Sequence, residues 1–340
     1  MTGPVGLSLS LGPSPVGGAT APTIVGFAYP GELLIVDGGT GSVQWRRDGE
    51  NITGETSLAY TVGINDIGKS IDVIRGEQES DPVTCWHPKD EPGVSVVLLG
   101  NNQVFNAVDP EVEATDGQTV RRWRDQSANA FAFDQSTGAN QPLRQTTEVS
   151  GNDTVQFDGV DDILDGGPNS VIRNKQFGYM IVACADTNRT GGNDRHAVLQ
   201  VSTNAIGGAA VWMAMFTRFN GNNFAVGSRR RFTDSVSSAE SPSESGYHVL
   251  SGEARWSAGS LRLRVDGTQV SADDDISSGP SQNADSPTIR VGSSGVRPFP
   301  GHVAFALVAA PDSEWTATQR SRIERYAGLL IGKDIPLVTP

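Results

Sequence analysis

Carboxylates are the charged side chains that this sequence holds in excess, 39 acidic residues against 26 Lys and Arg. Two carboxylates that flank one glycosidic bond can hydrolyse it, one as acid and the other as base or nucleophile. The densest acidic stretches are Asp158, Asp161, Asp162 and Asp165, and the run 273–275. Both stretches fall in predicted turns, where aspartate is common for structural reasons. We therefore expect no catalytic residue and no enzymatic activity.

Nucleophilic catalysis, and metal binding by histidine or cysteine, need these side chains in recognisable spacings. The four histidines are scattered, at positions 87, 196, 248 and 302, and no G-x-S-x-G turn precedes a helix. Cys85 and Cys184 fall in different predicted domains, so they predict no disulfide. Free thiols fit synthesis in a reducing cytoplasm. We expect no His or Cys metal site and no cofactor.

Three aspartates near position 160 have one alternative role. Asp158, Asp161 and Asp162 could offer hard oxygen ligands to calcium. The same carboxylates could instead accept hydrogen bonds from the backbone N–H groups of a turn. We favour the turn and assign no metal site.

The stretch 210–218, AVWMAMFTR, alternates in a way that favours a binding strand. If Met213 and Met215 face the core, the opposite face presents Trp212, Phe216 and Arg218. Sugar rings stack on aromatic faces, and a flanking cation supplies hydrogen bonds. We therefore predict a glycan-binding platform of Trp212, Phe216 and Arg218. The alternative is that both aromatic side chains belong to the core.

The length and composition predict two β-rich domains. A chain of 340 residues can form two domains with separate cores, and its 40 Gly and 19 Pro are typical of a turn-rich β protein. No apolar run approaches the roughly 20 residues that cross a bilayer, and the N-terminus lacks the basic region of a secretory signal. The net charge of −13, spread over both halves, disfavours nucleic acid as a partner.

Turn residues and strand-like alternation divide the chain into four parts. Residues 1–21 form an uncharged arm rich in Gly, Pro and Ser, in which LSLSL alternates like a strand. Residues 22–85 carry several short predicted strands, and 86–94, with two prolines, predict a linker. Residues 95–340 carry nine or more apolar-rich runs and one amphipathic helix, expected at 316–332. The fold class is therefore all-β, a small sandwich followed by a larger one.

Three motifs of the first predicted domain carry a resemblance. They are WRRDGENITG at 45–54, Tyr60, and NDIGKSI at 65–71. Together they resemble the immunoglobulin-like (Ig-like) modules of phage structural proteins. The resemblance implies that Trp45 fills the core and that residues 66–68 form the corner before the next strand.

The second predicted domain carries a longer series of motifs. They are, in order, RRWRDQSANA (121–130), TVQFDGVDDIL (154–164), LRLRVDGTQV (261–270), IRVGSS (289–294), PFPGHVAFALV (298–308) and ERYAGLLIGKDIP (324–336). The series resembles the concanavalin A-like lectin and laminin-G-like jelly rolls of phage and bacterial surface proteins. The resemblance implies a jelly roll over 95–340 with one closing helix. Glucan-cleaving members of that fold carry E-x-D-x-E or E-x-D-x-x-E on one strand, and this sequence has neither.

The two resemblances together imply a phage virion protein: a head fibre, a capsid decoration protein or a tail-associated receptor binder. The arm 1–21 would contact other virion proteins, and the jelly roll would contact a host-surface polysaccharide. We expect a homo-oligomer in the virion, assembled in the host cytoplasm, with no nucleic acid partner and no membrane insertion. Two alternatives stay open. One is a structural cement protein that binds only capsid neighbours, and the other is a secreted bacterial protein that binds or degrades glycans.

Overall fold

The chain forms two compact units, with the boundary between Cys85 and Trp86. The computed structural model describes residues 20–101, 104–106, 108–109, 111–168, 171–187, 195–202, 211–219, 223–229, 237–242, 244–274, 276, 278–279, 281, 287–292 and 298–338. Nearly all of the predicted arm, residues 1–19, lies outside this part. Each unit is a β-sandwich, and the described residues contain a single α-helix. The all-β fold class predicted from the sequence is confirmed.

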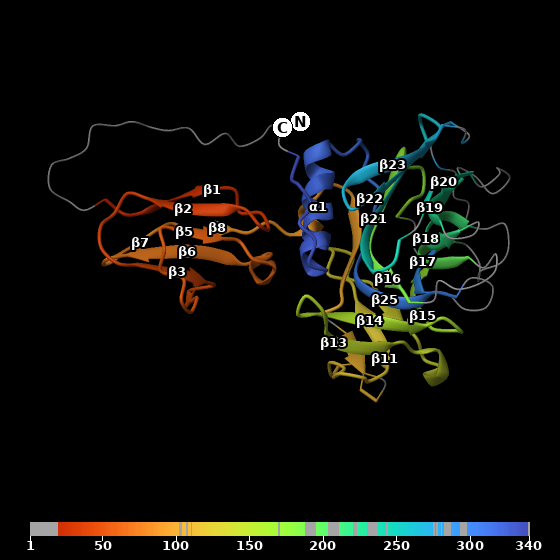
Figure 1. Cartoon of the computed structure of the whole chain (residues 1–340), viewed down its shortest axis with the longest axis horizontal. Coiled ribbons are helices and arrows are strands. Elements are labelled where there is room, and N and C mark those ends of the chain that lie inside the picture. The colour runs from red at the N-terminus through yellow and green to blue at the C-terminus, as the bar shows by residue number, and fades with distance from the viewer. Residues whose placement is uncertain are drawn as a thin grey trace. The chain divides into compact units, whose positions relative to one another are not determined.

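The first unit is a small sandwich of two antiparallel sheets (Figure 1). The three-stranded sheet has the order β1 (Thr23–Gly26), β2 (Leu33–Asp37) and β5 (Ala59–Thr61). The five-stranded sheet has the order β4 (Glu50–Asn51), β3 (Val43–Arg47), β6 (Ser70–Arg75) and β7 (Gln78–Glu79), with β8 (Val83–Thr84) also paired to β6. A short 3-10 turn, η1 (Ile64–Asp66), precedes β6. The alternating apolar residues of both sheets form one core.

Trp45 occupies this core, as the sequence predicts. Its side chain is fully buried, and its Nε1–H donates to the carbonyl of Ser57 at 2.9 Å. Its ring centroid lies 5.4 Å from that of Tyr60. The Tyr60 hydroxyl donates to Asp66 at 2.6 Å, and Asp66 also pairs with Arg47 at 2.6 Å. One buried aromatic pair therefore joins the core to the corner that precedes β6.

Replacing Trp45 by Ala should unfold the first unit. Truncating a buried tryptophan costs roughly 3–5 kcal/mol, a large part of the stability of a small domain. Urea denaturation followed by circular dichroism measures the loss. Leu58→Ala is the control, because Leu58 is half exposed and its truncation should cost much less. A Trp45→Ala variant with an unchanged unfolding midpoint would contradict this role.

The second unit is a larger antiparallel sandwich (Figure 1). Its nine-stranded sheet has the order β10 (Val104–Asn106), β11 (Val120–Arg124), β12 (Ala132–Asp134), β15 (Ile163–Pro168), β24 (Thr288–Gly292), β17 (His196–Ser202), β18 (Val211–Phe219), β19 (Asn223–Ser228) and β20 (Ser237–Pro242). Its eight-stranded sheet has the order β13 (Leu143–Val149), β14 (Asn152–Asp158), β25 (Pro300–Ala309), β16 (Phe177–Asp186), β21 (Tyr247–Arg255), β22 (Ser260–Val265) and β23 (Thr268–Asp273), with β9 (Val94–Leu99) also paired to β25. The facing sides of both sheets contribute to one large core.

The helix α1 (Ala317–Leu330) covers the outer face of the eight-stranded sheet and contacts β16, β21 and β25. Its position agrees with the predicted helix at 316–332. Thr316 caps it, because its hydroxyl accepts a hydrogen bond from the backbone N–H of Gln319 at 3.2 Å. The predicted apolar stripe of Ile323, Tyr326, Ala327 and Leu330 is buried. No helix among the described residues is long and apolar enough to cross a bilayer.

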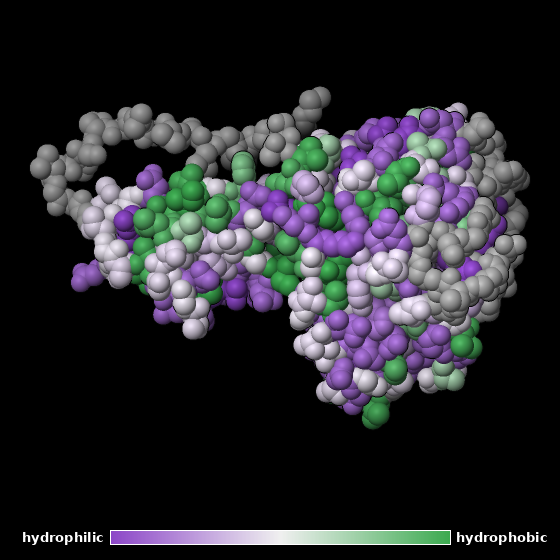
Figure 2. All heavy atoms as spheres, in the orientation of Figure 1, coloured by the Kyte–Doolittle hydropathy of each residue, from purple (hydrophilic) through white to green (hydrophobic). Residues whose placement is uncertain are grey.

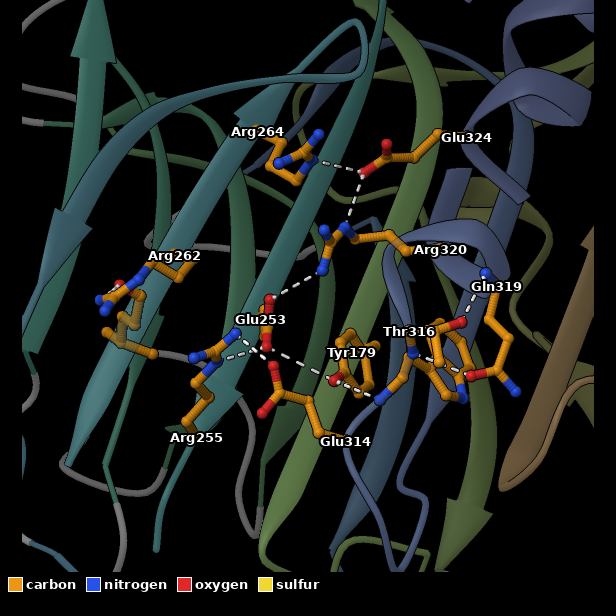
Figure 3. Close-up of polar contacts among 12 residues, drawn as sticks. Tyr179, Glu253, Arg255, Arg262, Arg264, Glu314, Thr316, Gln319, Arg320 and Glu324 are labelled. Atoms are coloured by element: carbon orange, nitrogen blue, oxygen red, sulfur yellow. Dashed lines mark hydrogen bonds and ion pairs between the residues drawn. The ribbon is translucent and has the colours of Figure 1, made fainter. Parts of the chain in front are cut away.

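Buried charges lie between α1 and the sheet beneath it (Figure 3). Glu253 of β21 pairs with Arg320 of the helix at 3.3 Å, and Glu324 of the helix pairs with Arg264 of β22 at 3.1 Å. Both glutamates are almost completely buried, and burial raises the pKa of Glu324. Each has an arginine partner, which buried carboxylates need to remain charged. The pairs therefore fix where the helix sits on the sheet.

The segment 86–94 is not the linker that its prolines and charges predicted, because it packs within the second unit. The indole of Trp86 meets the ring of Tyr326 edge-on, with centroids 6.5 Å apart. Trp86 Nε1–H donates to Glu91 at 2.9 Å, and Glu91 pairs with Arg322 of α1 at 3.0 Å. Both Trp86 and Glu91 are buried. The charge of Glu91 was interpreted as a sign of solvent exposure, but Glu91 forms a buried ion pair with Arg322.

Candidate functional site

The outer face of the nine-stranded sheet carries a row of polar side chains. The register aligns Arg122, Asp134, Asp165, Arg290 and Gln200 across β11, β12, β15, β24 and β17. The adjacent residues of the same strands point into the core; they are Trp123, Phe133, Leu164, Val291 and Val201. Because side chains alternate along a strand, the five aligned residues point away from that core. We call them the polar row.

Arginine–carboxylate pairs connect the members of the polar row. Arg122 donates to both carboxylate oxygens of Asp134, at 2.7 and 3.0 Å. Arg290 donates from Nε to Asp165 at 3.0 Å and from Nη1 to the hydroxyl of Ser202 at 3.0 Å. The side chains of Asp134 and Asp165 are 44% and 40% exposed, whereas that of Arg290 is 12% exposed. The row therefore opens to solvent at its carboxylates and is covered toward Gln200.

Gln200 lies at the covered end of the row and differs from the other members. Its side chain is fully buried, and neither Oε1 nor Nε2 has a hydrogen-bond partner in the described part of the chain. A buried amide group without a partner costs about 1–3 kcal/mol, so native structures rarely keep one without a reason. The next positions in register are Ala214 and Gly227, whose side chains are small or absent. The Gln200 amide is thus a buried donor and acceptor without a partner among the described residues.

Two members of the platform predicted from Trp212, Phe216 and Arg218 are buried. All three belong to β18, beside Gln200 of β17, but the side chain of Trp212 lies outside the described residues. Phe216 and Arg218 are only 2% and 4% exposed. Phe216 packs against Phe219, with centroids 4.9 Å apart, and against three alanines of β17, β18 and β19. Phe216 does point away from the main core, but it is buried in this second apolar cluster, so it offers no open ring to a sugar.

The sequence contained a signal for Gln200 and Arg290 that its analysis missed. Each is the polar residue in the middle of an apolar run, in HAVLQVS at 196–202 and in IRV at 289–291. Such a residue indicates the outer face of a strand. Asp165 was predicted to lie in a turn, but it lies in β15. Which strands are neighbours could not be read from one sequence, so the row itself was not predictable.

The three aspartates considered for calcium form a turn, as predicted. Their carboxylate oxygens lie within 4.8 Å of one another. Asp158 accepts hydrogen bonds from the backbone N–H groups of Val160 and Asp161, at 2.8 and 3.3 Å. Asp162 accepts one from the backbone N–H of Asp158 at 2.7 Å. Burial raises the pKa of Asp162 to about 6, and the charges of Asp158 and Asp161 add to the rise.

Replacing Asp162 by Asn should change how stability depends on pH. The folded protein holds a proton on Asp162 up to about pH 6, whereas the unfolded chain releases it near pH 4. Asp162 therefore stabilises the fold below about pH 4, and this contribution disappears as the pH rises through about 6. Relative to the original protein, Asp162→Asn should gain about 1–3 kcal/mol between pH 4 and pH 7. Urea denaturation in EDTA measures this, and a difference that stays constant with pH would contradict it.

A second polar cluster combines an aspartate, a histidine and a threonine, residue types that occur in hydrolytic relays. His196 Nδ1 lies 2.6 Å from Asp186 Oδ2, and the Thr217 hydroxyl donates to the same oxygen at 2.8 Å. A nucleophilic hydroxyl must instead donate to the histidine that acts as its base. Asp186, His196 and Thr217 are all buried. The arrangement joins the ends of β16, β17 and β18 and does not provide a hydroxyl–imidazole pair.

The sequence matches no model of a known protein family and no curated protein. Its fold is similar to solved receptor-binding domains of clostridial toxins. One is from botulinum neurotoxin type C, whose cell entry depends on two ganglioside molecules (TM-score 0.45, 9% identity, 69% of this chain and 51% of that one). Another is the binding domain of botulinum neurotoxin DC in complex with SialylT (0.45, 9%, 71% and 52%). A third is from Paraclostridial Mosquitocidal Protein 1 (0.47, 11%, 70% and 53%).

This chain spans about half the length of those toxin domains. Similarity at such TM-scores and identities assigns neither a ligand nor a role. The function has to be argued from the residues of the polar row.

Proposed function

We propose that this protein is a carbohydrate-binding display protein without enzymatic activity, and that the polar row binds the hydroxyl groups of a polysaccharide. The observation that carries the proposal is the Gln200 amide, which is buried and has no hydrogen-bond partner among the described residues. It lies in register with Arg290, whose guanidinium is held by Asp165 and Ser202. Fixed polar groups of this kind orient a polar ligand.

The chemistry of the row suits sugar hydroxyls, each of which can both donate and accept a hydrogen bond. Asp134 and Asp165 supply acceptors at the exposed end. Arg290 supplies donors, and Gln200 supplies one donor group and one acceptor. The protein carries a net charge of −13 and the exposed end of the row is acidic, which disfavours strongly anionic polymers. We therefore propose a neutral or weakly charged polysaccharide as the ligand.

The location follows from the two resemblances seen in the sequence. We propose that a phage virion carries the protein and that the second unit binds a host-surface polysaccharide. Affinity for a single sugar site would be weak, and many copies on one particle would raise it by avidity, on the order of 10²–10⁴-fold. Mass spectrometry of purified particles tests the location independently of sugar binding. If the protein is absent from the particles, the proposed virion location is wrong, whereas the proposed sugar site is unaffected.

Replacing Gln200 by Leu should abolish polysaccharide binding and stabilise the protein. Leucine has a similar size, and it removes two buried polar atoms that lack partners, so unfolding should cost about 1–3 kcal/mol more. Arg290→Gln should also weaken binding at least tenfold, because it removes the guanidinium from the row. Binding is measured on arrays of bacterial surface polysaccharides with the protein multimerised on beads.

Arg262→Gln is the matched control, since Arg262 pairs with Asp274 at 2.6 Å on the other sheet. It should bind polysaccharide as the original protein does. Two results would overturn the proposal. One is that Gln200→Leu binds normally, and the other is that it is less stable, because the amide would then have a structural partner.

A further inference from the structure

The outer face of the three-stranded sheet in the first unit is apolar and exposed. Val25 of β1 pairs in register with Ile35 of β2, and Ile35 pairs with Ala59 of β5. Leu33 lies two residues before Ile35 on the same side of β2. The side chains of Val25, Leu33 and Ile35 are 44%, 52% and 48% exposed. Their neighbours Leu34 and Val36 point into the core, so this face is opposite to it.

The loop after β1 continues the apolar surface. Phe27 is 66% exposed and stacks on Tyr29, with ring centroids 5.7 Å apart. Figure 2 shows hydrophobic residues gathered over the part of the first unit where Figure 1 places β1 and β2. We call Val25, Phe27, Leu33 and Ile35 the apolar face. Contiguous exposed patches of this kind mark sites of interaction.

The size of the apolar face argues against a dimer of two such faces. Four half-exposed side chains offer apolar area on the order of a few hundred Å². A stable dimer buries about 800 Å² on each partner. A single extended segment needs much less, and it can lay every second side chain on a sheet.

A segment N-terminal to β1 has the alternating apolar pattern that such docking needs. In residues 5–11, VGLSLSL, the apolar side chains Val5, Leu7, Leu9 and Leu11 alternate with Gly and Ser. Residues 1–31 contain no Asp, Glu, Lys or Arg, so no side-chain charge opposes burial on an apolar surface. An extended strand with this alternation has one apolar side.

The length of chain between this segment and β1 allows it to fold back. The eleven residues from Gly12 to Pro22 span up to roughly 36 Å when extended. They include Gly12, Pro13, Pro15, Gly17 and Gly18, residue types that favour reversals of the chain. A short tether also keeps the segment at an effective concentration on the order of millimolar, which favours binding within one molecule.

We propose that residues 5–11 dock on the apolar face of the same molecule, with Leu7, Leu9 and Leu11 against Val25, Leu33 and Ile35. The inference is independent of polysaccharide binding, which concerns the other unit. It gives the arm a role in the free protein, in addition to the contacts with virion proteins expected from its sequence.

Disulfide cross-linking in the full-length chain tests the docking. A Leu9→Cys/Ile35→Cys variant should form an intramolecular disulfide under mild oxidation, identified by peptide mass spectrometry and by migration as a monomer. The native Cys85 and Cys184 are buried and do not compete. In the control, Leu9→Cys/Glu50→Cys, the second cysteine is exposed on β4 of the other sheet. The control should cross-link at least tenfold less.

Equal cross-linking of both pairs would overturn the proposal, because the arm would then sample the whole unit. A disulfide-linked dimer as the main product would also overturn it, since the arm would then dock on a second copy. Alkylation of an Ile35→Cys variant gives a second readout. Adding Leu7→Ser, Leu9→Ser and Leu11→Ser should speed its reaction with iodoacetamide several-fold, whereas adding Ser8→Ala and Ser10→Ala should not. Equal rates in all three proteins would contradict the docking.

Discussion

Two sheets share one core in the larger unit, and everything else in that unit depends on this constraint. Each strand places every second side chain in the core, and the residues between them point outward. The seventeen strands formed by the described residues therefore create two wide outer faces. An outward side chain must be exposed to water, be covered by another element, or bind a ligand. The two sheets meet this requirement in different ways. Buried charges on the eight-stranded sheet form ion pairs, whereas Gln200 on the nine-stranded sheet has no partner among the described residues.

The helix α1 lies on the eight-stranded sheet, and the two buried glutamates between them each pair with an arginine. Glu253 pairs with Arg320, and Glu324 pairs with Arg264. Buried ion pairs add little net stability compared with apolar residues of the same shape, but an unpaired buried charge is strongly destabilising. The helix is therefore held where both glutamates keep an arginine partner. These charges specify where the helix lies, and the buried stripe around Ile323 supplies the hydrophobic stabilisation.

Local periodicity, of period two for strands and 3.6 for the helix, was enough to predict the fold class, the buried Trp45 and the helix at 316–332. The interpretation of 86–94 as a linker and the expected exposure of Phe216 and Arg218 were wrong for a common reason. The local sequence pattern indicates which way a side chain points. Whether that side chain is buried depends on elements from distant parts of the chain that pack on it. Glu91 is buried by α1, more than 200 residues later. The order of the strands could not be predicted either, because β24 lies between β15 and β17 in the sheet although it is far from both in the sequence.

The nine-stranded sheet gives the clearest contrast. Arg122 pairs with Asp134 and Arg290 pairs with Asp165 within the polar row, as Arg320 and Arg264 pair with glutamates under α1. Gln200 has no hydrogen-bond partner among the described residues, although it is as deeply buried as Glu324. If the only constraint at this position were folding, a leucine would fill the same space without the cost of desolvating an amide. The proposed polysaccharide accounts for such a group, because hydrogen bonds lost in folding would be regained on binding. Gln200 and Arg290 are therefore the two positions at which the proposed binding should be tested first.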